Sequence, residues 1–292
     1  MEYTIENEIL KISVETLGAQ LSSIYSKKTE TEYLWQGDGK YWKGRAYNLF
    51  PYVGRFYDGK YSVYGKEYEM DRHGFARGSE FVLREKTENS LTFTISATEN
   101  TLTEYPFEFI FSVKYLLTDN KLRVLYTVEN VGDKAMYFGL GGHPGFNVPF
   151  GGGEFEDYFV EFEKECKPIR ILANEKGLIT SERAEMDLQD GKKIELRHCL
   201  FDEDAIIMET ECRAVSIKSG NTVNSVKVTF PQMPYLGIWH MPKTDAPYIC
   251  IEPWLTLPSN DGKVEELETK TNVGICKVGE VYENYFDIQI NE

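Results

Sequence analysis

The sequence predicts an all-β protein, a large antiparallel β-sandwich, and three observations carry that prediction. Short runs of alternating apolar and polar residues recur along the 292-residue chain, as in half-buried strands. Polar turns such as Thr118–Asn120 and Asn130–Gly132 separate these runs. No long segment has apolar residues at helical spacing, and only Val264–Glu268 resembles a short helix. Many short strands with this spacing are typical of a sandwich or barrel.

The expected strands begin near the N-terminus. Residues 3–26 alternate on either side of a turn at Gly18, which predicts a strand pair. Leu34–Tyr52 is rich in aromatic residues without a clean period, so we expect loops that pack their rings over another surface. Asp58-Gly59 predicts the turn of a hairpin that continues to Tyr64. Later strands are expected at 80–84, 91–96, 107–115, 122–128, 158–162, 205–208, 215–218, 226–230, 236–239, 248–251 and 286–290.

The composition gives no reason to divide the chain, so we expect one domain over residues 1–292. It is 41% hydrophobic and 14% aromatic, which is typical of a globular protein and not of a disordered one. No Pro/Gly/Ser-rich linker interrupts it, and no repeat of solenoid or propeller length is present.

Charge and cysteine usage narrow the possible partners. A formal net charge of −15 repels phosphate backbones and anionic lipids, so we expect neither nucleic acid nor membrane as a partner. The acidic N-terminus lacks the apolar region of a secretory signal, and no segment is apolar over the roughly 18 residues of a membrane span. The five cysteines are widely spaced and odd in number, which favours reduced thiols in a cytoplasmic protein.

Gly139–Pro149 places a single histidine, His143, among four glycines, two prolines and an asparagine. Glycine allows tight turns and close approach of the backbone, and Pro144 biases His143 towards an extended conformation. We therefore expect a histidine held in a fixed direction, at a strand end or in a turn. Taken alone, this stretch is explained about equally well by a structural turn in which the histidine caps nearby carbonyls.

A second stretch, Tyr248–Trp254, carries a lone carboxylate, Glu252, at the end of an apolar strand. A buried charge without a partner is costly, so its presence there favours a function. Cys250 would share its face of the sheet with Glu252, because side chains two residues apart in a strand point the same way. A small buried packing residue is the likelier role for that cysteine.

Two further polar residues lie beside glycines and aromatic residues. Arg55 follows Gly54, and its forked guanidinium suits paired hydroxyls or a carboxylate, although alone it would pass for a solvated charge. His73 lies before Gly74 in a loop. With His143 and Glu252 they provide an acid, a base and hydrogen-bond donors, whereas His198 and His240 look like ordinary structural residues.

Several site types are not indicated. The chain has no HExxH motif, no zinc spacing of cysteine and histidine, and no calcium loop; Phe201–Asp204 is acidic but lacks the required glycine and glutamate. It has no GxSxG elbow, GxGxxG turn or Walker loop. We therefore expect no metal, no cofactor and no covalent nucleophile.

Four stretches in this order, Asn48–Arg55, His73–Arg77, Gly142–Asn147 and Ile249–Trp254, resemble the aldose 1-epimerase (galactose mutarotase-like) family. The resemblance covers nearly the whole chain. It is closest to the branch often encoded beside lactose-utilisation genes.

This resemblance implies a β-supersandwich that binds a free aldohexose such as glucose or galactose on a concave sheet face. It implies mutarotation, with His143 as general acid, Glu252 as general base, and Arg55 and His73 holding sugar hydroxyls. Asp204 is the candidate for the family's sugar-contacting aspartate, although its flanking sequence departs from the better-known galactose enzymes. We expect a monomer or a homodimer.

Three alternatives stay open. A hexose-6-phosphate epimerase would need a cationic pocket, for which Arg55, Arg72 and Arg77 are candidates, but the chain is acidic and no further arginines cluster near Glu252. A non-catalytic sugar-binding or sensor module would keep Arg55 and the aromatic residues without needing both His143 and Glu252. A structural sandwich without a ligand is the third.

Overall fold

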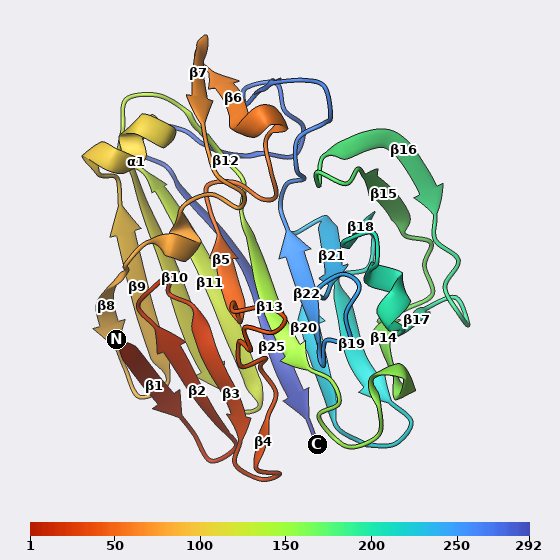
Figure 1. The fold of residues 1–292 in the computed structure, drawn as a ribbon. Coiled ribbons are helices and arrows are strands. Elements are labelled where there is room, and N and C mark those ends of the chain that lie inside the picture. The colour runs from red at the N-terminus through yellow and green to blue at the C-terminus, as the bar shows by residue number, and fades with distance from the viewer.

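Two large antiparallel sheets form the layers of a sandwich in the computed structural model, which describes residues 1–292 (Figure 1). The nine-stranded sheet contains, in spatial order, β17 (Lys193–Glu195), β14 (Tyr158–Phe162), β19 (Ala214–Ser219), β20 (Ser225–Thr229), β25 (Val281–Asn291), β11 (Lys121–Asn130), β10 (Phe109–Thr118), β9 (Ser90–Ser96) and β8 (Val82–Lys86). The seven-stranded sheet contains β16 (Ile179–Glu185), β15 (Ile169–Ala173), β18 (Ile206–Glu209), β21 (Tyr235–Trp239), β22 (Tyr248–Trp254), β13 (Gly141–Asn147) and β5 (Ala46–Leu49). The predicted all-β antiparallel fold is confirmed.

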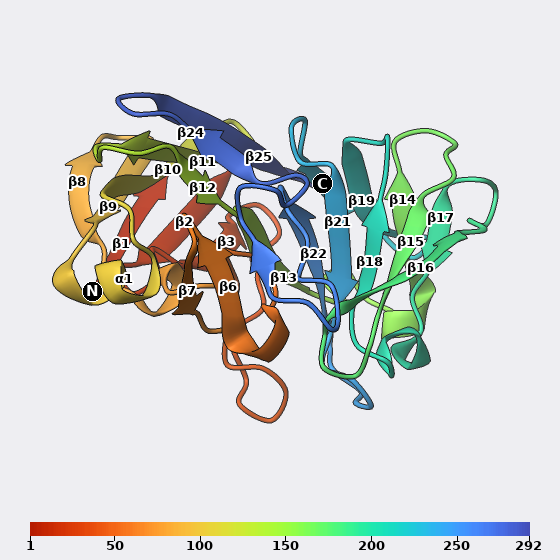
Figure 2. The same ribbon diagram turned by 90° about the horizontal axis from the view of Figure 1, so that it is seen from above.

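The apolar core lies where these sheets face each other. In Figure 2, β25 and β11 lie on one side of β13 and β22. The contact is close, because a Cβ added to Gly142 of β13 would lie 2.5 Å from the Phe286 ring of β25. One cluster of 62 buried residues extends from Ile5 to Ile290. We therefore propose that residues 1–292 fold as one unit, as the sequence predicted.

Three small sheets and a few short helices complete the molecule. The small sheets contain β1 (Glu2–Glu6), β2 (Leu10–Glu15), β3 (Leu21–Ser26) and β4 (Thr31–Glu32); β23 (Glu265–Glu266), β6 (Lys60–Val63) and β7 (Lys66–Glu69); and β12 (Met136–Phe138) with β24 (Gly274–Cys276). The helices are α1 (Glu99–Glu104) and the single turns η1 (Tyr57–Gly59), η2 (Ala76–Gly78), η3 (Phe155–Asp157) and η4 (His198–Phe201). None of them has the length or the apolar character of a membrane-crossing helix.

The predicted strands are present, and the alternation of their side chains explains why. In β10 and β11 every second residue is buried, so the polar residues between them face away from the core. Most boundaries agree within three residues, but β25 begins five residues before the expected 286. The patterns miss β13, because its glycine-rich sequence looks like a turn. They also miss β4, β5, β7, β12, β15, β16, β17, β23 and β24.

Two local predictions are wrong. Asp58-Gly59 lies in η1 and does not join two strands, because the preceding residues form an irregular loop that offers no partner strand. The hairpin instead joins β6 to β7 through Tyr64 and Gly65, whose φ angles of 51° and 71° suit a two-residue turn.

The predicted helix at Val264–Glu268 is also wrong. Its first glutamates form β23, which pairs in parallel with β6 and directs the Glu265 side chain into the interior. The helix occurs instead at α1, in a polar stretch where the sequence shows no helical pattern. There the Thr98 side chain accepts a hydrogen bond from the Thr101 amide, so the helix begins with a capping box.

Candidate active site

His143 lies within strand β13 and not in a turn or at a strand end, so that expectation is wrong. None of Gly141, Gly142 and Gly145 has a positive φ. These glycines instead let neighbouring side chains pack directly against the backbone of β13, since a Cβ at Gly141 would lie 2.8 Å from the Trp254 ring. β13 runs between β5 and β22, and His143 lies opposite Tyr47 of β5. The extended conformation expected before Pro144 is present.

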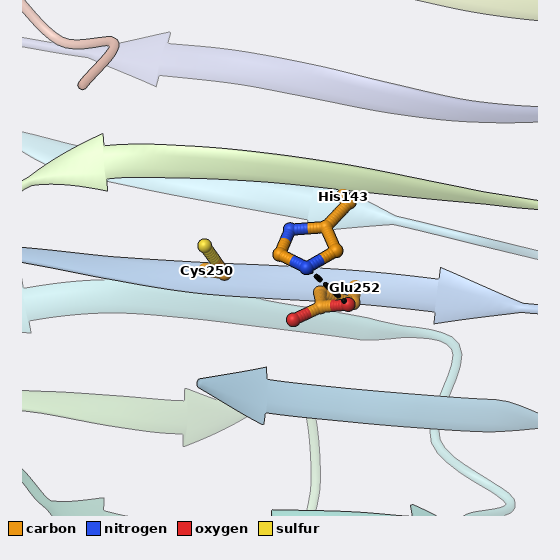
Figure 3. A group of neighbouring side chains, drawn as sticks. All are labelled: His143, Cys250 and Glu252. Carbon is orange, nitrogen blue, oxygen red and sulfur yellow. Dashed lines mark ion pairs between the residues drawn. The ribbon is translucent and has the colours of Figure 1, made fainter. Parts of the chain in front are cut away.

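The alternation of β22 brings Glu252 to His143. Ile249 and Ile251 belong to the main core, whereas Cys250 and Glu252 point to the opposite face of the sheet. The distance between His143 Nε2 and Glu252 Oε2 is 3.2 Å, and Figure 3 shows the two side chains directed at each other from neighbouring strands. Glu252 is only 2% exposed. The sequence could not show this meeting, which depends on the pairing of β13 with β22.

Aromatic rings enclose the pair. The Trp42 ring centroid lies 4.9 Å from that of His143, and the Trp239 centroid lies 5.6 Å from it. Trp42 comes from the aromatic segment 34–52, which covers another surface as expected. His143 Nδ1 and Trp254 Nε1 are buried without a hydrogen-bond partner. The resulting environment is poor in water and holds polar atoms that a ligand can satisfy.

Burial sets the protonation of both members of the pair. It raises the pKa of Glu252 well above its usual value, and the negative charge of Asp204 acts in the same direction. Burial lowers the pKa of His143 to about 3, and the positive charges of Arg72 and Arg77 contribute to the lowering. Both shifts favour the neutral form of each group, so a proton shared by the pair rests on the carboxyl group and not on the imidazole.

The pair opens into a cavity of about 690 Å³, and the other three predicted site residues also line it. Arg55 lies in the loop between β5 and η1, directly after Gly54. Gly54 has a φ of 74°, and a Cβ there would lie 2.3 Å from Pro258. The position therefore requires glycine, and this requirement fixes where the loop presents Arg55.

His73 is held beside the pair by an unusual backbone conformation. Its φ is 67°, and its Nδ1 accepts a hydrogen bond of 3.1 Å from the Gly54 amide. Nε2 is therefore the nitrogen that carries the proton, which suits donation to a ligand oxygen. The ring centroids of His73 and His143 are 5.7 Å apart. Burial lowers the pKa of His73 well below its usual value, and a positive charge on His143 or on the nearby arginines acts in the same direction.

Asp204 lies in the turn between η4 and β18, with a φ of 91°. Trp239 Nε1 donates a hydrogen bond of 2.9 Å to its Oδ1. This bond fixes the carboxylate against the cavity wall, across from the arginine-bearing loop. The structure thus brings together all five predicted residues, whereas His198 and His240 bond to each other outside the cavity, with Nδ1 and Nε2 3.2 Å apart.

Some cavity residues carry no signal in the sequence. Trp42 and Tyr47 are two of many aromatic residues in segment 34–52, and nothing distinguishes them from core residues. Glu175 and Gly177 come from the turn between β15 and β16, and Lys243 comes from the loop after β21. Only the folding of these turns over the β13–β22 face makes them neighbours of the histidine.

One group of residues in this site could hold a metal ion. The ligating atoms of His143, Cys250 and Glu252 lie within 4.8 Å of one another (Figure 3). Imidazole, thiolate and carboxylate together would suit a borderline ion such as Zn²⁺. Such an ion would occupy both His143 and Glu252. The same atoms could then not exchange protons with a substrate.

Comparison with known proteins gives consistent results. A model of the family described as aldose 1-epimerase matches residues 1–261. Two proteins of Lactococcus lactis subsp. lactis, called protein LacX, plasmid and protein LacX, chromosomal, are each 35% identical over 283 residues, which covers 94% of both chains. These relatives agree with the lactose-associated branch that the sequence resembles.

Solved structures agree as well. A galactose mutarotase related enzyme from Lactobacillus acidophilus is 34% identical and superposes with a TM-score of 0.95, covering 100% of this chain and 98% of the other. A galactose mutarotase-like protein from Lactobacillus casei is 30% identical, with a TM-score of 0.93 and complete coverage of both chains.

Proposed function

Since the chain belongs to the aldose 1-epimerase family, and is therefore an enzyme that acts on a sugar, we propose that it interconverts the α and β anomers of an aldohexose. The observation that carries this proposal is the His143–Glu252 pair, with 3.2 Å between Nε2 and Oε2, at the wall of a cavity that also presents Arg55, His73 and Asp204. The cavity thus offers one proton donor, one acceptor and additional polar groups for hydroxyls.

The proposed reaction needs two proton transfers in each direction. Transfer of the resting proton from Glu252 to His143 gives a carboxylate and an imidazolium. Glu252 then takes the proton of the anomeric hydroxyl, a C1–O1 double bond forms as the C1–O5 bond breaks, and His143 protonates O5. Rotation about C1–C2 followed by the reverse transfers closes the ring as the other anomer and restores both groups. No covalent intermediate with the enzyme is required.

Desolvation supports the assignment of these roles. The raised pKa of Glu252 makes its carboxylate a stronger base, and the lowered pKa of His143 makes its imidazolium a stronger acid. A proton can then move between Glu252, the sugar oxygens and His143 without creating a long-lived buried charge. His73 and Arg55 would hold sugar hydroxyls, and Asp204 would accept a hydrogen bond from one of them.

A sugar-binding module without catalysis explains the site less well. Such a module would gain from Arg55 and the tryptophan walls, but it has no need for a carboxyl group that is 2% exposed and directed at a histidine. Keeping that group in the fold costs desolvation free energy without improving the binding of hydroxyls. An acid–base function supplies the reason for its presence.

Polarimetry tests the proposal. The substrates are freshly dissolved α-D-glucose and α-D-galactose, and the equilibrium anomer mixtures of their 6-phosphates, whose exchange is followed by NMR. The rate of anomer exchange would be measured with wild type, His143→Ala and Glu252→Gln. His198→Ala and Glu280→Gln are matched controls, because both residues lie outside the cavity. We expect acceleration by wild type and both controls, and its loss in both cavity variants. Sugar binding without acceleration by wild type would overturn the proposal in favour of a binding module.

A further inference from the structure

Three arginines face the cavity without a carboxylate partner. Arg55, Arg72 and Arg77 line it, and none of the 16 ion pairs in the structure includes any of them. The chain has 47 acidic and 32 basic side chains, so acids are in excess over the molecule as a whole. A cluster of unpaired arginines in such a chain therefore needs an explanation of its own.

The three guanidinium groups come from one side of the cavity. Arg72 directly precedes His73 in the segment between β7 and η2, Arg77 lies in η2, and Arg55 lies on the loop that bonds to His73. Burial, and then the positive charges of Arg55 and Arg77, lower the pKa of Arg72 against the opposing charges of Asp204 and Glu252. Like charges at this proximity repel one another, so the cluster is unfavourable until an anion joins it.

Arg72 and Arg77 lie against different parts of the cavity wall. A Cβ added to Gly177, in the turn between β15 and β16, would lie 3.3 Å from Arg72 Nη2, so this guanidinium lies beside that turn. The Arg77 guanidinium lies 5.6 Å from the centre of the Tyr47 ring, next to His143 in the sheet. Both guanidiniums line the same cavity of about 690 Å³.

The five acids that line the cavity form no ion pair with the three arginines. Asp202, Glu203 and Asp204 belong to the turn before β18, and Asp204 is held there by Trp239. The other two are Glu175 and Glu252, and the cavity also contains one lysine, Lys243. The negative charges of Asp204 and Glu252 act on Arg72 without an ion-pair contact, so its N–H donors are open to an anion.

We propose that Arg72 and Arg77, with Arg55 beside them, bind an anionic group on carbon 6 of the aldohexose. The substrate is then a hexose 6-phosphate or a hexuronate, in place of the uncharged sugar that the resemblance implied. This inference rests on the proposed anomer interconversion. Arginine binds phosphate and carboxylate through paired N–H donors, so one cluster suits both kinds of substrate.

The chemistry of the reaction locates the anion on carbon 6. A group on O1 would block mutarotation, because the anomeric hydroxyl must lose its proton. Carbon 6 is attached to carbon 5, which carries the ring oxygen, so its substituent lies beside the group that protonates O5. His143 has that role here, and Arg72 and Arg77 are the arginines whose charges act on its ring.

Binding of the anion would also assist the reaction. The arginines oppose a positive charge on His143, and an anion between them cancels that opposition. The imidazolium needed to protonate O5 then forms more readily. A charged substrate would thus contribute to kcat as well as to binding, whereas an uncharged sugar leaves the repulsion in place.

Magnetisation exchange between the α and β anomeric protons at equilibrium measures the reaction for all substrates under the same conditions. The probes are galactose, galactose 6-phosphate, galacturonate and the corresponding glucose series. We expect wild-type kcat/KM to be at least about 10-fold higher for one of the two anion types than for the uncharged sugar. The phosphate and carboxylate series distinguish the two sources of the anion.

Arginine variants test the assignment. Arg72→Gln and Arg77→Gln should each lower the ratio of anionic to uncharged kcat/KM by about 10- to 100-fold, the loss expected for a charge-assisted hydrogen bond. Arg84→Gln is the matched control, since Arg84 is an exposed, unpaired arginine of β8 outside the cavity, and it should leave the ratio unchanged. Arg72→Lys should retain part of the ratio of anionic to uncharged kcat/KM that Arg72→Gln loses. Melting curves check that each variant is folded.

The outcomes separate the two proposals. Acceleration of uncharged sugars equal to or above that of both anionic series, or a ratio that survives both glutamine variants, would overturn the anion site and leave the proposed function intact. If no sugar is accelerated, the proposed function fails. In that case, calorimetry measures the affinity of wild type and of Arg72→Gln for galactose 6-phosphate. The anion site requires wild type to bind more tightly, and equal affinities would overturn it.

Discussion

The molecule buries two acid–base pairs, and their carboxyl groups have pKa values shifted in opposite directions. At the cavity, Glu252 faces His143 across 3.2 Å, and His143 Nδ1 has no hydrogen-bond partner. Beneath the loop after β22, Glu265 Oε2 lies 2.7 Å from Lys270 Nζ, and both side chains are less than a tenth exposed. Burial favours the neutral form of the first pair and leaves it incompletely satisfied, whereas the second has a carboxylate that is surrounded by donors and favoured in its ionised form.

The donors around Glu265 explain the difference. Ser259 Oγ donates to its Oε2 at 2.8 Å, and Asn260 Nδ2 donates to its Oε1 at 2.7 Å. Burial alone would raise the pKa of Glu265, but Lys270 and these hydrogen bonds outweigh it, so the pKa is lowered. Glu252 receives no comparable support, and burial raises its pKa. A carboxyl group without donors retains its proton and can transfer it, while one with a full set of donors is a fixed structural anion.

The largest expected contrast is in activity. Glu252→Gln and His143→Ala should each lower kcat for anomer exchange by about 10²- to 10⁴-fold, because they remove a general base or a general acid. Glu265→Gln should change kcat by no more than a few-fold while the protein is folded, because Glu265 does not line the cavity. Exchange rates at equal concentrations of folded enzyme measure this contrast. Equal losses in Glu252→Gln and Glu265→Gln would contradict it.

The next contrast is in stability. Lys270→Met leaves the Glu265 carboxylate buried without its cation, which should lower the free energy of unfolding by about 3–5 kcal/mol. Lys277→Met removes an ion pair whose lysine is 76% exposed and should cost no more than about 1 kcal/mol. Urea denaturation of both variants measures the difference. A small effect of Lys270→Met would mean that the second pair is as dispensable for stability as a surface pair.

A smaller effect concerns the strand that presents the first pair. Gly142→Ala should cost about 1–3 kcal/mol, because its Cβ would lie 2.5 Å from the Phe286 ring and force β13 away from β25. The displacement should also lower kcat by moving His143, the next residue. Gly220→Ala is the control, since a Cβ there meets no atom within 4 Å. The free energy of unfolding and the rate of anomer exchange would be measured for both variants. Equal values would show that close packing is not the reason for glycine at position 142.

The pH dependence of stability should have opposite signs at the two glutamates. The folded-state pKa of Glu252 is raised, so its contribution is full below the unfolded value near 4.5 and is lost as pH rises towards the folded value. Glu252→Gln cannot ionise, so its melting temperature should rise relative to wild type as pH increases from 5 to 8.

The folded-state pKa of Glu265 is lowered, so its contribution is present above 4.5 and is lost as pH falls through the folded value. The advantage of wild type over Glu265→Gln should therefore shrink on acidification from pH 5 to 3. Melting temperatures of the three proteins across pH 3–8 test both signs. The same sign for both variants would show that the two carboxyl groups have similar protonation.

Much of the fold could be predicted because alternation is a local property. A strand such as β10 shows in its own ten residues which side chains face the core. β13 was mistaken for a turn, because its glycines serve contacts with β25 and Trp254 that no local pattern encodes. The same limit applies to the hairpin, which turns at Tyr64-Gly65 although Asp58-Gly59 is the stronger local turn signal, because the pairing of β6 with β7 decides where the turn lies.

The sequence by itself determined which chemical groups were available: a histidine among glycines, a carboxyl group in an apolar strand, and arginines beside a second histidine. It also determined that Glu252 and Cys250 share a face of their strand, because that follows from the two-residue repeat. The tertiary structure decided that His143 meets Glu252, that Arg72 and Arg77 lie near His143, and that the pKa of Glu252 is raised while that of Glu265 is lowered. Protonation depends on burial and on neighbours from distant segments, so it exists only once the sheets have packed.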